Sequence, residues 1–227
     1  MYRIRLKFAK SGDIRFLSHL EVMRTFERAL RRTALPYMVT QGYSPKPKIS
    51  WGLPLMVGAE SNSEYVDLFL KDKVSGEKII ERLNLKLPKG LKVLEAKSIE
   101  AKAPSLMSLV AFALYDIVVE LEKEVEKEAI KHGLSSFFEK ECIKILKKGR
   151  ERIVNLREAV LDFSLIKVNK ERVFFRAKIS LSNETISPFY LVELVLSAMN
   201  VTPLKTNVCR IELYGKKNCS LTSLMNL

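Results

Sequence analysis

The chain has 227 residues, of which 47% are hydrophobic, and this is enough for two domains of about 100 residues that each bury a core. Its three cysteines lie far apart without a CxxC pair, and it has only two histidines. This pattern argues against a disulfide framework, a zinc site or an iron–sulfur cluster, so we expect no metal and no cofactor. The net charge of +13 at neutral pH favours a polyanionic partner, and RNA is the first candidate.

The longest apolar stretch, residues 106–121, is interrupted by polar side chains. It is also shorter than the ~20 apolar residues that a membrane-spanning helix needs. The start of the chain alternates basic and apolar residues and therefore lacks the apolar run of a signal peptide. We expect a cytoplasmic protein with no membrane partner.

Basic residues are concentrated at the beginning of the chain. The first 50 residues carry eleven basic and three acidic side chains, a net charge of +8 and more than half of the total. A local excess of this size predicts contact with phosphate groups. The basic residues are Arg3, Arg5, Lys7, Lys10, Arg15, Arg24, Arg28, Arg31, Arg32, Lys46 and Lys48.

The first half of the chain predicts the element order β-α-β-β-α-β. Residues 2–8 alternate between apolar and basic side chains, which is typical of a half-buried strand. Ser18 and Glu21 have the spacing of a capping box, which predicts the start of a helix that ends before Pro36. The later elements are expected at residues 49–53 (extended), 65–70 (strand), 75–83 (helix) and 91–99 (strand).

The second half repeats this order, so we expect an α+β protein with two tandem ferredoxin-like domains and antiparallel sheets. The predicted domains are residues 1–102 and 103–215, followed by a flexible tail over residues 216–227. The second domain is expected to have strands at 106–121, 153–168, 172–181 and 208–214, and helices at 123–147, broken at Gly133, and 187–199.

The start of the first helix is the first candidate site. Free backbone N–H groups and the helix dipole favour an anion there, beside Arg15, Ser18 and His19. If the loop over residues 41–48 folds back over this end, its lysines join a phosphate site. His19 is also a candidate general acid or base. Alternatively, Ser18 only caps the helix and His19 only covers the strand.

The loop Gln41-Gly42-Tyr43-Ser44-Pro45-Lys46-Pro47-Lys48 is the second candidate. Its prolines stiffen the backbone that presents Lys46 and Lys48, and Tyr43 and Trp51 could stack on bases. A tryptophan at the start of a strand also suits the core. We expect a partner-binding loop.

Three arginines spaced four residues apart on the predicted helix are the third candidate: Arg24, Arg28 and Arg32. This spacing places them on one helix face. The face either contacts RNA or is simply solvated.

Two segments resemble a known family: RIRLKFAKSGDIRFLSHLEVMRTFERALRRTALP (3–36) and QGYSPKPKISWGLPLMVGAESNSEYVDL (41–68). Both are similar to the radical SAM-linked proteins, modules fused to or encoded beside B12-binding radical SAM proteins. The resemblance implies a radical SAM partner. Since the chain has no CxxxCxxC motif, it implies an accessory protein and not the radical enzyme itself.

We therefore expect a non-catalytic protein that binds tRNA or ribosomal RNA beside a radical SAM enzyme in RNA modification. One alternative is a metal-independent endoribonuclease that uses His19 and resembles CRISPR repeat-processing enzymes, although their glycine-rich loop near the C-terminus is missing here. The other is an adaptor whose basic surface docks on an acidic protein. The predicted RNA-binding residues are Arg15, Ser18, His19, Arg24, Arg28, Arg32, Tyr43, Lys46 and Lys48.

Overall fold

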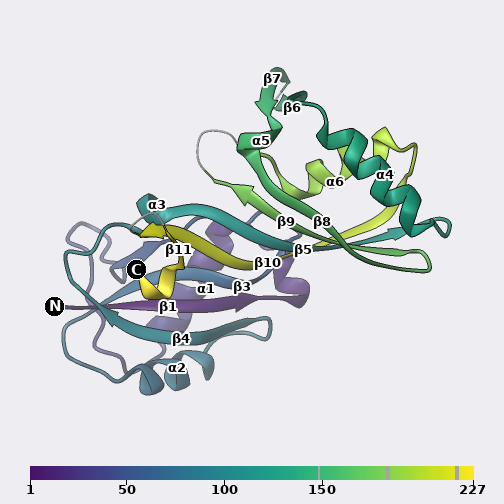
Figure 1. Ribbon diagram of the computed structural model, residues 1–227. Coiled ribbons are helices and arrows are strands. Elements are labelled where there is room, and N and C mark those ends of the chain that lie inside the picture. The colour runs from purple at the N-terminus through teal and green to yellow at the C-terminus, as the bar shows by residue number, and fades with distance from the viewer. Residues whose placement is uncertain (148, 182–184, 218–219) are drawn as a thin grey trace. The chain divides into compact units, whose positions relative to one another are not determined.

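The computed structural model describes residues 1–147, 149–181, 185–217 and 220–227. The chain is a mixed α+β protein with antiparallel strand pairs, and it divides into two compact units (Figure 1). Unit 1 consists of residues 1–110 and 213–227, and unit 2 of residues 111–212. Among the described helices, none is long and apolar enough to cross a membrane.

Unit 1 has the strand order β4-β1-β3, and both β2 and the last part of β10 pair with β3. The predicted order of its first elements is confirmed, with small shifts of the boundaries. The elements are β1 (Tyr2–Lys10), η1 (Gly12–Phe16), α1 (His19–Arg31), β2 (Ile49–Trp51), β3 (Glu60–Leu70), α2 (Gly76–Asn84), β4 (Leu91–Ile99), α3 (Leu106–Leu109), β11 (Ser220–Ser223) and η2 (Leu224–Asn226).

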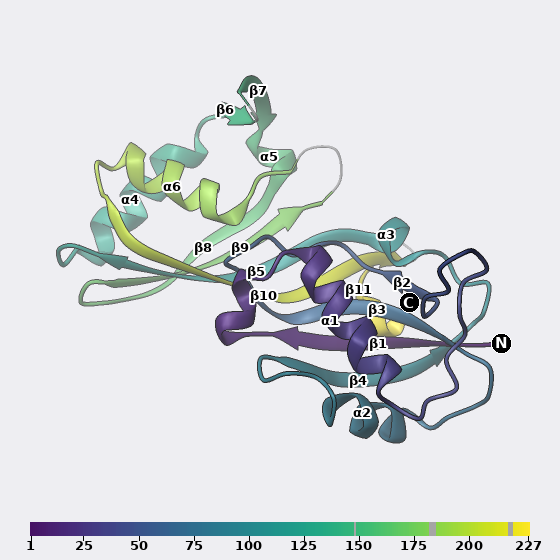
Figure 2. The same cartoon turned by 180° about the vertical axis from the view of Figure 1, so that it is seen from behind.

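Helix α1 starts where the sequence predicts. The Ser18 side chain accepts a hydrogen bond from the backbone N–H of Glu21, and the Glu21 carboxylate accepts one from the backbone N–H of Ser18 at 2.8 Å. Because both orphan N–H groups are satisfied, the capping box is confirmed. Beyond it, the apolar stripe of α1 buries Phe26 and Leu30 completely against the sheet, and α1 crosses β1 and β3 in Figure 2.

The other face of the unit 1 sheet is covered by the end of the chain, so the prediction of a flexible tail over residues 216–227 is wrong. Strand β10 (Pro203–Lys217) continues past residue 215, and Leu224 and Met225 are buried. Arg5 Nη1 donates a hydrogen bond to the Leu224 carbonyl at 2.8 Å, and Lys97 Nζ donates to the Met225 carbonyl at 2.9 Å. The segment is therefore docked on the sheet by buried apolar side chains together with hydrogen bonds to its carbonyls. Residues 218 and 219 lie outside the described residues.

The predicted boundary at residue 102 is also displaced. Arg3 donates hydrogen bonds to the carbonyls of Ala103 and Pro104, and Leu106 is fully buried. These contacts belong to unit 1, which therefore extends to Val110. Residues 106–109, predicted as the start of a strand, form the short helix α3, which Ser105 caps.

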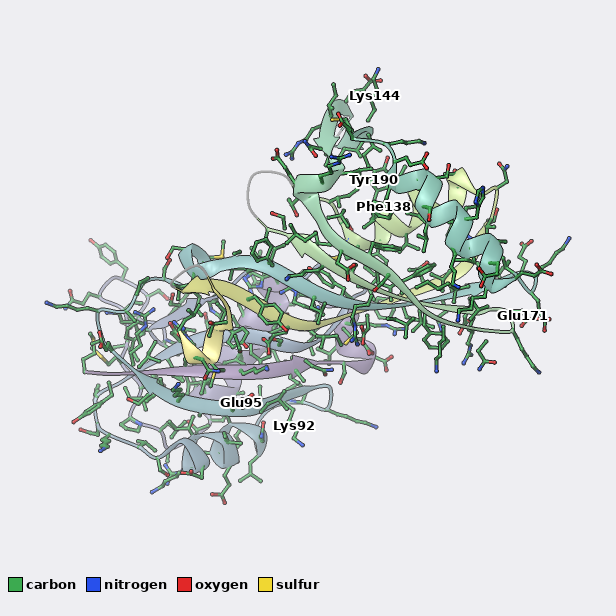
Figure 3. The ribbon with its side chains drawn as sticks, in the orientation of Figure 1. Lys92, Glu95, Phe138, Lys144, Glu171 and Tyr190 are labelled. Carbon is green, nitrogen blue, oxygen red and sulfur yellow. The ribbon has the colours of Figure 1, made fainter. Side chains whose placement is uncertain are left out.

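Unit 2 has the strand order β10-β5-β9-β8 and a separate hairpin of β6 and β7. Helices α4 and α6 lie on one side of the sheet, and Phe138 of α4 stands 5.6 Å from the ring of Phe163 (Figure 3). The new elements are β5 (Val110–Leu121), α4 (Lys127–Phe138), β6 (Cys142–Lys147), β7 (Arg150–Asn155), α5 (Leu156–Ala159), β8 (Val160–Asn169), β9 (Arg172–Ser180) and α6 (Pro188–Ala198).

The long helix predicted over residues 123–147 is wrong in its second half. Helix α4 ends at Phe138, and the following residues form the β6–β7 hairpin, which turns at Gly149 with a φ of 74°. The predicted break at Gly133 does not occur. Gly133 instead permits a close helix contact, because a Cβ there would lie 2.5 Å from Met199 Cγ. The strand predicted over 153–168 is interrupted by α5.

Candidate functional site

The loop over residues 41–48 does not fold back over the start of α1, so the predicted joint phosphate site is not assembled. The start of α1 lies beside the end of β1, where Lys10 Nζ donates to the carbonyls of Arg15 and Leu17 at 3.1 and 2.8 Å. The loop lies at the opposite end, where Arg31 Nη2 donates to the Pro45 carbonyl at 3.3 Å. A helix that returns along a sheet has its two connections at opposite ends, and this separates the two predicted halves of the site.

The N-terminus of α1 already holds an anion from its own chain. Hydrogen bonds from the Ser18 side chain and backbone lower the pKa of Glu21 from its usual value, so this carboxylate is charged at neutral pH. The Arg15 guanidinium lies 3.7 Å from Glu60 Oε1 and 4.8 Å from the Phe16 ring centroid. Ser18 and Arg15 are therefore engaged within the protein.

His19 is packed edge-on against Trp51, with ring centroids 5.8 Å apart. Partial burial and, to a smaller extent, the charge of Lys10 lower the pKa of His19 below 6.5, so its imidazole is neutral at pH 7. The hollow beside it measures about 10 Å³, room for about one water molecule. A neutral imidazole suits a general base, but a hollow of this size does not admit a phosphate group.

Trp51 is partly buried and packs against the core, so it is not an exposed stacking platform. Its ring lies edge-on to Phe8 and Phe26 at centroid distances of 6.3 and 5.5 Å. Two buried ionisable groups line the hollow next to it, Lys10 and Glu64, which are 2% and 6% exposed. The sequence pattern predicts neither the burial of Lys10 nor a role for Glu64. The register shift of β1 between Phe8 and Lys10 is not visible in the sequence.

Much of the positive charge of β1 is structural. Arg3, Arg5 and Lys10 are at most 5% exposed. Arg3 Nη2 lies 2.6 Å from Asp67 Oδ2, and Arg5 Nε lies 2.9 Å from Asp67 Oδ1. The charge excess of the first 50 residues therefore overstates the charge that an RNA can reach.

Exposed cations gather where α1 ends. Arg31 contacts the loop, and Arg32 Nη2 donates to the Lys86 carbonyl at 3.0 Å. Among the described residues, the cations at this end make no ion pair with a carboxylate. We name this surface the basic end and define it by Arg28, Arg31, Arg32, Tyr43 and Lys46, all of them exposed.

The loop of the basic end is held in place by its own backbone. Thr40 N–H donates to the Lys46 carbonyl at 2.8 Å, and Lys46 N–H donates to Thr40 Oγ1 at 3.1 Å. Val39 and Pro47 form a β-bridge below the loop, whose tip presents the fully exposed Tyr43. The remaining predicted residues separate: Arg24 is exposed nearer the start of α1, and Lys48 Nζ lies 4.9 Å from the ring centroid of Phe69.

Within the described part of the chain, no group of three or more His, Cys, Asp or Glu side chains is placed to hold a metal ion.

Two solved structures are similar to the chain. The first is the archaeal box H/ACA sRNP Nop10-Cbf5 complex (12% sequence identity, 91% of this chain, TM-score 0.49), and the second is an H/ACA RNP bound to a substrate RNA containing 2'-deoxyuridine (13%, 92%, 0.49). The chain spans 46% of the matched chain in each. No curated protein matches it. Residues 3–188 match the family described as "Uncharacterized protein conserved in bacteria" (DUF2344), and the chain therefore belongs to this family.

Proposed function

We propose that the chain is a non-catalytic RNA-binding protein of the cytoplasm that holds tRNA or ribosomal RNA at the basic end of unit 1. The observation that carries this proposal is the gathering of Arg28, Arg31, Arg32 and Lys46 around the exposed ring of Tyr43. None of these four cations is neutralised by a carboxylate among the described residues, so their charge is available to a partner.

The chemistry of this surface suits an RNA backbone with an unpaired base. Guanidinium groups bind phosphate oxygens through paired donors, and an exposed tyrosine ring offers a face on which a base can stack. The hydrogen bonds from Arg31 to Pro45 and between Thr40 and Lys46 fix the loop against α1. A surface that is ordered before binding loses less entropy when it binds.

The proposed interface differs from the one that the sequence predicts. It keeps Arg28, Arg32, Tyr43 and Lys46, adds Arg31, and leaves out Arg24, which lies nearer the start of α1. It omits Arg15, Ser18, His19 and Lys48, whose side chains contact the protein itself.

We also propose that both units are ferredoxin-like. The spatial order β4-β1-β3-β2 in unit 1 and β10-β5-β9-β8 in unit 2 supports this, because each sheet has the order of a split β-α-β fold. We further propose a radical SAM enzyme as a partner, and this proposal rests on the family resemblance of residues 3–36 and 41–68. Co-purification of the chain with such an enzyme after RNase treatment tests it.

A titration of labelled tRNA at several salt concentrations tests the proposed function. Four phosphate contacts predict a slope of log affinity against log salt of about −3. Arg28→Ala/Arg31→Ala/Arg32→Ala should reduce the magnitude of this slope and weaken binding. The control Lys123→Ala/Lys127→Ala/Lys131→Ala removes the same charge from exposed positions of unit 2 and should bind nearly as the wild type does.

A slope near zero, or equal losses in both triple variants, would refute RNA binding at the basic end. Cleavage of the RNA that disappears in His19→Ala would favour the endoribonuclease. Capture of an acidic protein without RNA would favour the adaptor.

A further inference from the structure

One face of the unit 2 sheet is left uncovered by its helices. Along β5 the buried residues Tyr115, Ile117 and Val119 alternate with partly exposed ones, so the two faces of the strand have different environments. Strand pairing places the partly exposed residues in rows across β5, β9 and β8. We name this surface the open face and define it by Val118–Phe174–Lys167, Asp116–Arg176–Ser164, Leu114–Lys178–Asp162 and Phe112.

The open face carries two aromatic rings, each with a lysine over it. Lys167 Nζ lies 4.4 Å from the ring centroid of Phe174, and Lys178 Nζ lies 5.7 Å from that of Phe112. Phe174 is opposite Val118, six residues from Phe112 along β5. At the usual rise per residue, the two rings are about 20 Å apart on the same face.

The charges of this surface are divided between paired arginines and available lysines. Arg176 makes two hydrogen bonds to the Asp116 carboxylate, at 2.7 and 2.9 Å, and Arg172 lies 3.1 Å from Glu120. Lys167 and Lys178 make no ion pair with a described carboxylate. The ammonium groups beside the two rings are therefore not held in a described ion pair, although Asp162 of β8 is opposite Lys178.

This arrangement complements a single strand of RNA. Every base has a flat face that can stack on an aromatic ring, and every nucleotide brings a phosphate that a neighbouring ammonium group can bind. The bases of a duplex are already stacked on one another, so a ring on a sheet surface reaches only unpaired bases. We propose that the open face binds single-stranded RNA, with bases stacked on Phe112 and Phe174 and phosphates on Lys178 and Lys167.

This inference rests on the proposed function, because it assumes an RNA partner and specifies that the bound part is unpaired. A titration with a short polyuridine oligonucleotide and with a fully paired RNA of the same length tests it. Phe112→Ala and Phe174→Ala should each lower the affinity for polyuridine about tenfold and leave the affinity for the duplex unchanged. Leu204→Ala, at a residue of β10 that is 65% exposed and lies outside the open face, is the control for lost apolar area and should have little effect.

Two further variants separate stacking from a general loss of structure. Phe174→Leu keeps an apolar side chain without a flat ring, and it should bind polyuridine as weakly as Phe174→Ala. Phe174→Trp keeps a stacking ring and should retain the affinity. Because Trp51 in unit 1 is the one tryptophan of the chain, polyuridine should quench the additional fluorescence of Phe174→Trp over the wild type.

Three outcomes would overturn the inference. Equal binding of polyuridine by Phe174→Leu and the wild type would exclude stacking. Unchanged binding by both alanine variants, together with a loss in Arg28→Ala/Arg31→Ala/Arg32→Ala, would refute the open face and leave the proposed function intact. Failure of the wild-type protein to bind either RNA would refute both.

Discussion

The two units use similar side chains on the sheet face that their helices leave free, with opposite results. In unit 1 this face carries Arg3, Arg5 and Asp67, and all three are buried, with Arg3 bonded to the carbonyls of residues 103 and 104 and Arg5 bonded to that of Leu224. In unit 2 it carries Arg176 and Asp116, which remain exposed to solvent. The same kind of ion pair on a strand is therefore buried where another segment covers that face of the sheet and exposed where none does.

This difference determines what the charges can do. The buried arginines of unit 1 are committed to Asp67 and to backbone carbonyls, so a ligand cannot use them without unfolding part of the unit. The exposed pair of unit 2 is weakened by solvent, and such pairs contribute about 0–1 kcal/mol, so they can be exchanged for a ligand. Counting charges along the sequence does not distinguish these cases.

The largest expected effect comes from removing the central carboxylate of unit 1. Asp67→Ala leaves two buried arginines without their counter-ion, which should cost about 3–5 kcal/mol of unfolding free energy. Asp116→Ala, the matched change in unit 2, should cost about 1 kcal/mol or less. Urea denaturation of both variants measures the difference between the two losses of unfolding free energy. Similar losses would show that burying a sheet face under other segments does not make its ion pair more important for stability.

A smaller effect is expected when the cover of unit 1 is weakened. Leu224 is fully buried, and Leu224→Ala should cost about 2–4 kcal/mol because it leaves a cavity under η2. Leu204, which is 65% exposed, provides the control Leu204→Ala, with an expected change within about 0.5 kcal/mol. Hydrogen exchange should also accelerate in β1 and β3 of Leu224→Ala, and unchanged exchange there would argue that the segment does not protect the sheet.

The smallest expected effect is a dependence on pH that belongs to unit 1. Folding lowers the pKa of His19, so the unfolded chain binds a proton at His19 more tightly than the folded chain does. The unfolding free energy therefore decreases as the pH falls below 6.5. His19→Gln should remove part of this loss. His132→Gln, at an exposed position of unit 2, should retain it. The unfolding free energies of the wild type and both variants are measured between neutral and mildly acidic pH. The same pH dependence in all three proteins would contradict the prediction.

Local patterns in the sequence predict the local structure of unit 1 well. The alternation of residues 2–8 and the Ser18–Glu21 spacing are properties of a few neighbouring residues, and the strand and the capping box that they predict are confirmed. The predicted half-burial of the strand is wrong, because Arg3 and Arg5 on its second face are buried as well. The joint site of His19 and Lys46 is wrong because it depends on which end of the sheet each connection occupies. That geometry is set by the path of the chain and not by composition.

Elsewhere the sequence gives the wrong local structure or too little of it. Residues 142–147 follow a helix and carry charges that suit a helix, yet they pair with β7 and bury Ile145. The open face was not recognisable, because Phe112 and Phe174 come together on one surface only through the pairing of β5 with β9. The docking of Leu224 likewise depends on an arginine more than 200 residues earlier.

The hydrogen bond between Arg5 and the Leu224 carbonyl, whose partners are 219 positions apart in the sequence, has a consequence for biosynthesis. While the ribosome makes the chain, β1 emerges before unit 2, and the segment that covers β1 emerges after all of unit 2. Unit 2 is continuous and can fold as soon as it is complete, whereas Arg5 of unit 1 lacks its carbonyl partner until residue 224 has been made. Of the two units, the one whose synthesis starts earlier is therefore the one that finishes folding later.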